Sequence, residues 1–311
     1  MKKEGREGIS AMLSADLLSQ RAGIAMRYDS RLYTLSELAK LSSERVFDSL
    51  ESGLMPTEAL GDIGDGVLPF DFESRSELAT DEEPRLLCRA VSLCDRVAFI
   101  ELLLRRLSER GYTVSISDFF PDEELGDTVT YLKGALADEA FDLFSEYLPD
   151  ATVAYSESLR EGAQALADGR VAFLIAPLEE RGGVRIPSVV SLINRLSLKI
   201  AAVTPVYGFM GDADMKYALL SNSFMRPTLM QDDDLYLELA LEDMTKLTET
   251  LFALESLSHE VYRLFSLEGA DGAGGVTLII RANPERVAEL ISYLTVFIRD
   301  FSLVGIYKNL E

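Results

Sequence analysis

From residue 128 to residue 203, short apolar runs alternate with helix-like segments, and this alternation constrains the fold more than any other feature. Strands are predicted at 128–132, 152–155, 171–176 and 199–203, and the helices between them at 138–147, 158–167 and 188–195. The run Val171–Ala176 is apolar throughout, which is typical of a strand buried on both faces of a sheet. Strands that alternate with short helices predict βαβ units and a largely parallel sheet.

A second pattern begins at residue 234. Its strands are predicted at 235–241, 261–267, 276–282 and 302–307, and its helices at 245–257 and 284–300. A glycine-rich turn at 269–275 joins the second strand to the third. Asn283 caps the second of these helices and Pro284 occupies its first position. The order is βαββαβ, which predicts a four-stranded antiparallel sheet with two helices on one face, as in ferredoxin-like domains.

The first 120 residues are predicted to be mostly helical. Helices are expected at 9–24, from Thr34 onward, and from Glu83 to Arg110, with Pro84 in the first turn of the last helix and Gly111 ending it. The Gly/Asp-rich stretch at 61–66 predicts a loop, and residues 113–120 predict a strand. We therefore expect three regions: a helical region at 1–120, an α/β lobe at 121–230 and a βαββαβ domain at 231–311.

Composition narrows the class of function. The chain has 52 acidic and 30 basic residues and a formal net charge of −22, so it is expected to repel nucleic-acid phosphates and anionic lipids. No run approaches 18 apolar residues and no apolar leader stands at the start, which predicts a cytoplasmic protein without membrane spans. Cys88 and Cys94 are interpreted as reduced core thiols. With His259 as the one histidine, we expect no metal site and no cofactor, and we interpret His259 as a surface or capping residue rather than a general base.

Three segments resemble one enzyme family. The first is Val129-Thr130-Tyr131-Leu132 followed by Asp138-Glu139-Ala140, the second runs from Glu161 to Glu179, and the third is Leu303-Val304-Gly305-Ile306-Tyr307. In order and spacing they are similar to the opening strand, the "G-V-v-P-I-E" segment and the closing "L-G-S-Y-P" of prephenate dehydratases with a C-terminal ACT regulatory domain. The resemblance implies a lobe like those of periplasmic binding proteins, an ACT-like domain at 231–311 and a homodimer joined through ACT-like sheets.

The departures from the family pattern fall on the rim of the expected pocket. Where the family has P-I-E-N-S, this chain has Pro177-Leu178-Glu179-Glu180-Arg181, so a carboxylate replaces the amide and a guanidinium replaces the hydroxyl. The family's T-R-F strand corresponds to Met215-Lys216-Tyr217, without its threonine. A dianionic substrate would meet like charges at this rim, which cost binding energy. The predicted ligand-binding residues are Lys133, Glu179, Glu180, Arg181, Arg185 and Lys216; no catalytic residue and no metal ligand is assigned.

The resemblance, with these departures, implies a dehydratase-like scaffold that has lost its catalytic residues. Such a protein would bind a small anionic or aromatic metabolite, either an aromatic amino acid or a prephenate-like anion, in a regulatory role. The alternative is an active prephenate dehydratase of phenylalanine biosynthesis, a carbon–oxygen lyase, in which the first 120 residues replace a missing second lobe. A second alternative is a DNA-binding metabolite sensor, because Tyr33–Pro56 is similar to the first helices of MerR-type helix-turn-helix domains. Its turn is short and basic residues are sparse, so a capped helical hairpin is favoured.

Overall fold

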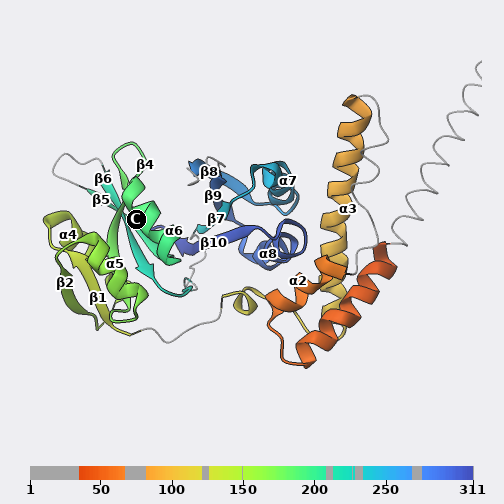
Figure 1. Ribbon diagram of the computed structural model, residues 1–311, viewed down its shortest axis with the longest axis horizontal. Helices are drawn as coiled ribbons and strands as arrows, with labels where there is room; N and C mark the ends of the chain where they lie inside the picture. The colour runs from red at the N-terminus through yellow and green to blue at the C-terminus, as the bar shows by residue number, and fades with distance from the viewer. Residues whose placement is uncertain are drawn as a thin grey trace, which may run out of the picture. The chain divides into compact units, whose positions relative to one another are not determined.

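The structure is a computed structural model that describes residues 35–66, 82–120, 126–148, 150–207, 213–225, 227, 234–267 and 275–310 (Figure 1). The chain divides into two compact units, residues 1–114 and residues 115–311, which are considered separately below. The helix predicted at 9–24 and the turn predicted at 269–275 lie outside the described residues. No helix in the described part of the chain combines the length and the apolar character that a membrane span requires.

Unit 1 contains three described helices: residues 35–51, α2 (Pro56–Gly66) and α3 (Glu82–Glu109). The first packs on the end of α3, where Arg110 lies 3.4 Å from Glu44 and the Arg106 guanidinium donates to the Ser36 hydroxyl. The last residue of α3 is Glu109, and Gly111, the predicted terminating glycine, follows it with a φ of 91° that suits glycine after a helix C-terminus. Residues 35–51 form one continuous helix, so no turn divides them into the two helices of a helix-turn-helix.

Two predictions for unit 1 are wrong. The Gly/Asp-rich stretch at 61–66 is not a loop but the second half of α2. Ala59, Leu60 and Ile63 of this helix are each 1% exposed, so burial of one apolar face outweighs the poor helix propensity of glycine and aspartate. Cys94 is a free, exposed thiol rather than a core residue.

The strand predicted at 113–120 is also absent. Ile116–Asp118 form instead a single 3₁₀ turn, η1, at the start of unit 2. The Asp118 carboxylate accepts a hydrogen bond of 2.7 Å from the Ser115 backbone N–H. Such local side-chain bonds compete with strand pairing, which is why serine and aspartate favour caps and turns.

The first part of unit 2 is an α/β layer. Strands β1 (Thr128–Leu132), β2 (Thr152–Ser156) and β3 (Phe173–Glu180) are parallel, as predicted. The helices that follow these strands are α4 (Ala135–Leu143), α5 (Leu159–Ala167) and α6 (Pro187–Leu196), with a 3₁₀ turn, η2, at Phe144–Glu146. The remaining strands are the two-residue β4 (Val184–Arg185), β5 (Lys199–Tyr207) and β6 (Ala213–Ser221).

The expectation of a largely parallel sheet fails at β6, which is antiparallel to both of its neighbours, β3 and β5. Strands β5 and β6 are separated by residues 208–212 alone. A parallel pair needs a crossover of a dozen or more residues, so a connection this short forces a hairpin.

The rest of unit 2 alternates strands and helices again. The strands are β7 (Leu235–Leu241), β8 (Glu260–Leu267), β9 (Gly275–Ala282) and β10 (Phe301–Lys308). The helices are α7 (Leu247–Ser256) and α8 (Val287–Tyr293), flanked by the short turns η3 (Met244–Lys246) and η4 (Pro284–Arg286) and the π-helical η5 (Leu294–Ile298). The strands pair antiparallel in the order β10-β7-β9-β8.

The ten strands in the described part of the chain belong to one sheet, in the order β2-β1-β3-β6-β5-β10-β7-β9-β8 with β4 beside β3. Its two parts meet where β10 runs parallel to β5 and Gly305 is paired with Ile200. A Cβ atom on Gly305 would lie 2.7 Å from the Ile200 carbonyl oxygen, closer than real contacts allow. Glycine at this position therefore lets the two backbones approach.

One core extends across this junction. It joins Leu192 and Ile193 of α6 to Tyr236 and Ala240 of β7 and to Ile279 of β9. A separate core on the opposite face of the first strands contains Ala137 and Ala140 of α4. In Figure 1, α6 lies where the green strands of the first part meet the blue strands of the second. The face of the sheet that α6 covers is the face that carries the candidate site.

Candidate functional site

A β-bulge at the end of β3 places a charged side chain inside the protein. The pairing of β3 with β6 shifts register between Pro177 and Glu179, which leaves Leu178 as the extra residue. Regular alternation would direct Leu178 and Glu179 to opposite faces of the sheet, but both line one small cavity. Glu179 is 3% exposed, so its carboxylate must find partners inside the fold.

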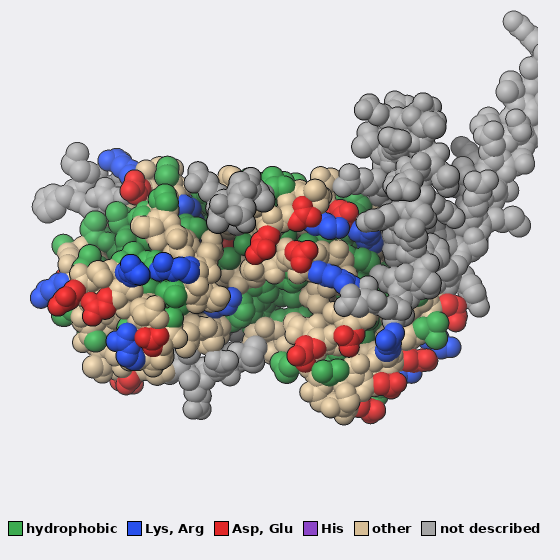
Figure 2. Space-filling view, viewed as in Figure 1, with side chains coloured by type: hydrophobic (Ala, Val, Ile, Leu, Met, Phe, Trp, Pro, Cys, Tyr) green, Lys and Arg blue, Asp and Glu red, His purple; other side chains and the backbone are tan. Residues whose placement is uncertain are grey.

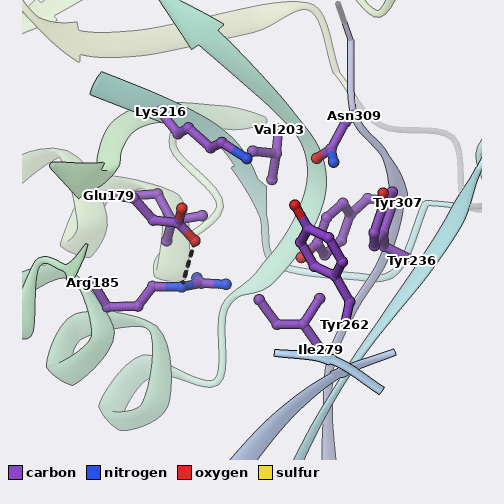
Figure 3. Close-up of a pocket in the computed structure, with 10 residues that line it drawn as sticks. Glu179, Arg185, Val203, Lys216, Tyr236, Tyr262, Ile279, Tyr307 and Asn309 are labelled. Atoms are coloured by element: carbon purple, nitrogen blue, oxygen red, sulfur yellow. Dashed lines mark ion pairs between the residues drawn. The ribbon is translucent and has the colours of Figure 1, made fainter. Parts of the chain in front are cut away.

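Two arginines provide those partners, and Figure 3 shows the first of them, Arg185. Oε1 of Glu179 lies 3.1 Å from Nε of Arg185, and Oε2 lies 2.9 Å from a terminal nitrogen of Arg263. Glu179 and Arg185 face each other across the β3–β4 hairpin, so local pairing fixes the first contact. Arg263 comes from β8 and reaches the hairpin at Gly183, whose φ of 79° favours glycine.

Glu238 continues this chain of charges. A terminal nitrogen of Arg185 donates to Oε2 of Glu238 at 2.8 Å, and the Tyr307 hydroxyl donates to the same oxygen at 3.2 Å. The Glu238 and Tyr307 residues are 4% and 2% exposed. We call Glu179, Arg185, Glu238, Arg263 and Tyr307 the ion-pair network; it connects strands from both parts of the sheet.

Charges in the network compensate each other. Burial works to lower the pKa of Arg185, but Glu238 and the other neighbours outweigh it, and the pKa lies above its ordinary value. Burial, with a contribution from Glu238, raises the pKa of Tyr307 well above its ordinary value, so the phenol keeps its proton and acts as a donor. Two guanidinium groups therefore neutralise two carboxylates, and no uncompensated charge of the network is left to hold a ligand.

The cavity beside Glu179 is small. Its volume of about 10 Å³ accommodates roughly one water molecule and no metabolite. Its lining, of which Figure 3 labels nine residues, consists of Leu178, Glu179, Arg185, Val203, Lys216, Tyr236, Tyr262, Ile279, Tyr307 and Asn309. Lys216 faces Glu179 across β3 and β6, and Figure 3 shows its ammonium end directed toward Asn309.

The structure brings three of the six predicted ligand-binding residues together. Glu179, Arg185 and Lys216 all line the cavity. Glu180 and Arg181 are exposed at the β3–β4 turn and do not line it. Lys133 is exposed after β1, where its ammonium group lies 5.0 Å from the centre of the Tyr155 ring. The ion pairs of Arg185 are buried rather than exposed to solvent.

Sequence reasoning missed three of the five network residues, those that come from the C-terminal strands: Glu238, Arg263 and Tyr307. One signal was available, since Glu238 is the lone charge in the strand Leu235–Leu241, whose seven residues are all buried. A carboxylate in such a strand needs a buried cation. Which cation it finds depends on strand pairing between distant segments, and a single sequence does not show that.

A larger groove lies on the same face of the sheet. It has a volume of about 940 Å³ and is separate from the small cavity, although Arg185 borders both. Its lining residues, which define the α6 groove, are Gly183, Val184, Arg185, Pro187, Val190, Ser191, Asn194, Arg195, Glu238, Phe265, Ser266 and Thr277. A volume of this size falls within the range of small-molecule sites, roughly 300–1,000 Å³.

His259 does not belong to either space. It is 6% exposed, so it is not the surface residue of the two predicted alternatives. In agreement with the capping alternative, its Nδ1 accepts a hydrogen bond of 3.0 Å from the backbone N–H of Asn283, the N-cap residue of η4. Burial lowers its pKa to about 4, and the ring is therefore neutral at pH 7. Among the described residues, no three His, Cys, Asp or Glu side chains come together as a metal ion would require.

Comparisons with known proteins find a likeness of fold. No protein-family model matches the chain, and no curated protein matches it significantly. The prephenate dehydratase of Streptococcus mutans is similar in structure, with a TM-score of 0.50 and 17% sequence identity over 60% of this chain and all of that one. GqqA, described as a novel type of quorum quenching acylase, has a TM-score of 0.44 at 16% identity, covering 58% of this chain and 95% of its own.

A third similar structure is the prephenate dehydratase of Arthrobacter aurescens in complex with L-Phe. It has a TM-score of 0.45 and 12% identity, covering 58% of this chain and 89% of its own. The mixed α/β fold of this chain is thus similar to that of a prephenate dehydratase, as the sequence resemblance predicted.

Proposed function

We propose that this protein is a prephenate dehydratase-like scaffold without dehydratase activity, which binds a small anionic or aromatic metabolite in a regulatory role. One observation carries the proposal. Glu179, where the sequence resemblance places the pocket rim, is buried in the ion-pair network beside a cavity with room for about one water molecule.

The chemistry of the reaction supports this reading. Dehydration and decarboxylation of prephenate require that two substrate carboxylates be held, that the departing hydroxyl be assisted and that water be excluded. The guanidinium groups of Arg185 and Arg263 already bind Glu179. A substrate carboxylate would have to displace that buried partner, which costs energy because it leaves a carboxylate unpaired.

The C-terminal part carries the regulatory half of the proposal. Residues 231–311 would form an ACT-like module, supported by the strand order β10-β7-β9-β8 and by the two helices α7 and α8. The module would also join two copies of the chain through β8. That strand ends the sheet, and its Tyr262 and Leu264 are 40% and 50% exposed.

A direct assay tests the loss of activity. Purified full-length protein is incubated with prephenate, and formation of phenylpyruvate is followed by ultraviolet absorbance. We expect no turnover above the uncatalysed rate. Turnover at about 1 s⁻¹ or more, typical of enzymes, would establish the active dehydratase instead.

Binding is tested separately by thermal unfolding in the presence of phenylalanine, tyrosine, prephenate or chorismate. A ligand at 100 times its dissociation constant adds about 2.7 kcal/mol to the free energy of unfolding, which gives a clear shift of the midpoint. A shift with one of these compounds, in a protein that does not turn prephenate over, is the expected result. Activity without any shift would contradict the regulatory role.

A further inference from the structure

Helix α6 has two faces with different surroundings. Val189, Leu192 and Ile193 are buried in the core. Five other residues line the α6 groove: Pro187, Val190, Ser191, Asn194 and Arg195. Their spacing of three and four residues places them along one side of the helix. The groove thus follows almost the whole of α6, a length of about 15 Å for ten residues.

The opposite wall of the groove comes from the C-terminal strands. Thr277 of β9 is paired with Phe265 of β8 and with Ala240 of β7, so the three side chains stand on one face of the sheet. Phe265 and Thr277 line the groove together with Glu238. The groove therefore has an apolar wall at Phe265 and a polar floor.

Three polar side chains of this lining, those of Thr277, Ser191 and Asn194, form no hydrogen bond within the described part of the chain. Thr277 is 6% exposed, and its hydroxyl has no hydrogen bond to any described residue. A ligand in the groove can therefore hydrogen-bond this hydroxyl without displacing a partner from the protein. Ser191 and Asn194 are exposed on α6, and their side chains are likewise without hydrogen bonds in the described part of the chain.

The charges of the groove are unbalanced by one. Arg185 and Glu238 bind each other at 2.8 Å and cancel. Arg195 is exposed and forms no ion pair with any described residue, so it is the remaining charge of the lining. Figure 2 shows acidic and basic side chains interspersed over the face that it displays. Because charges farther away than about 8–10 Å are screened at physiological salt, Arg195 dominates the local field despite the net charge of −22.

We propose that the α6 groove is the ligand site and that it takes a monoanion with an apolar body, such as an aromatic carboxylate or sulfonate. The anionic group binds the Arg195 guanidinium, the apolar body packs on Val190 and Phe265, and Thr277 bonds a polar group at the floor. This inference rests on the proposed function, because it names the site and the chemical class of the metabolite.

Two fluorescent dyes test the site in the full-length protein. 8-Anilinonaphthalene-1-sulfonate carries an aromatic body and one negative charge, and N-phenyl-1-naphthylamine has the same body without the charge. Removing the charge by Arg195→Gln is expected to weaken the sulfonate dye about tenfold, the effect of a lost charge-assisted hydrogen bond, and to leave the neutral dye unchanged. Arg195→Lys keeps the charge and should retain most of the binding.

The matched control is Arg160→Gln, which removes an exposed arginine from the neighbouring helix α5. It should change neither dye. A second variant, Ser191→Phe, fills the groove and should weaken both dyes. Circular dichroism and the unfolding midpoint verify that each variant is folded.

The outcomes separate this inference from the proposed function. If Arg195→Gln has no larger effect than Arg160→Gln, or if Ser191→Phe binds both dyes normally, the α6 groove is not the site, while a metabolite site elsewhere still agrees with the proposed function. Turnover of prephenate contradicts the proposed function and leaves the dye result standing. The assignment is supported if Arg195→Gln weakens the sulfonate dye while Arg160→Gln does not. It is supported further if an aromatic carboxylate such as benzoate displaces the sulfonate dye from the wild-type protein.

Discussion

The ion-pair network and the α6 groove lie on one face of one sheet and share Arg185 and Glu238. They differ in whether their charged side chains have partners within the protein. In the network, each carboxylate bonds a guanidinium and the adjacent space admits about one water molecule. In the groove, Arg195 and Thr277 have no partner among the described residues, and about 940 Å³ lies open beside them. A cluster of charges therefore marks a ligand site only when the fold leaves some of them unpaired.

Removing one arginine from each region gives the strongest test of this contrast. Arg185→Met leaves Glu238 without its cation, so the free energy of unfolding should fall by about 3–5 kcal/mol. The matched change Arg195→Met should cost less than about 1 kcal/mol, since Arg195 contributes no more than the favourable charge of the last turn of α6. Urea denaturation measures both. Equal losses would mean that the network is not a buried, mutually compensated set.

A second test asks whether the two parts of the sheet depend on close backbone contact as well as on ion pairs. Gly305→Ala would place a Cβ atom 2.7 Å from the Ile200 carbonyl oxygen, and the strands must separate to admit it. We expect a loss of about 1–3 kcal/mol in the free energy of unfolding. Gly134→Ala is the control, because a Cβ atom there meets nothing within 4 Å and the φ of 179° is ordinary extended backbone. A harmless Gly305→Ala would show that the β5–β10 contact is loose.

His259 extends the comparison to a buried group that stays neutral instead of finding a counter-ion. Its folded pKa of about 4 lies below the unfolded value of 6.5, so between these pH values the unfolded chain binds more protons. The contribution of His259 to the free energy of unfolding is therefore fully present above about pH 6.5. It decreases as the pH is lowered, and about 2 kcal/mol of it is lost at pH 5.

This contribution should disappear in His259→Gln, so the wild type and the variant differ in the slope of stability between pH 5 and pH 7. Since the chain has one histidine, its NMR titration can be followed without ambiguity. A measured pKa near 6.5 would mean that the ring is hydrated and contradicts the buried placement.

The smallest effect on stability is expected at the edge of the sheet. Leu264→Lys on β8 should leave the free energy of unfolding within about 0.5 kcal/mol, because the side chain is half exposed. If two copies of the 34.4 kDa chain associate through β8, as proposed, the variant should be monomeric by light scattering while the wild type is a dimer. Leu41→Lys, at another exposed leucine, should leave the dimer intact. A monomeric wild type would contradict the proposed association.

Much of the local structure follows from the sequence. The strand at 128–132, the buried strand at 235–241 and the end of α3 at Gly111 were all predicted, since apolar periodicity and glycine conformation act over a few residues. The errors arose where packing overrode local preference, as in the Gly/Asp-rich half of α2, or where a local side-chain bond replaced strand pairing, as at Ser115.

For the candidate site, the sequence indicated Glu179, Arg185 and Lys216 but not that the first two would neutralise each other. The α6 groove was not predicted, because it forms between residues as far apart in the sequence as Ser191 and Thr277, and its volume depends on how the elements pack. Interactions between near neighbours thus made the fold class and most helices and strands predictable, and the acidic charge follows from composition. Which charges are paired and which face a groove depends on distances that a bulge and the pairing of distant strands set, and these distances exist only in the folded chain.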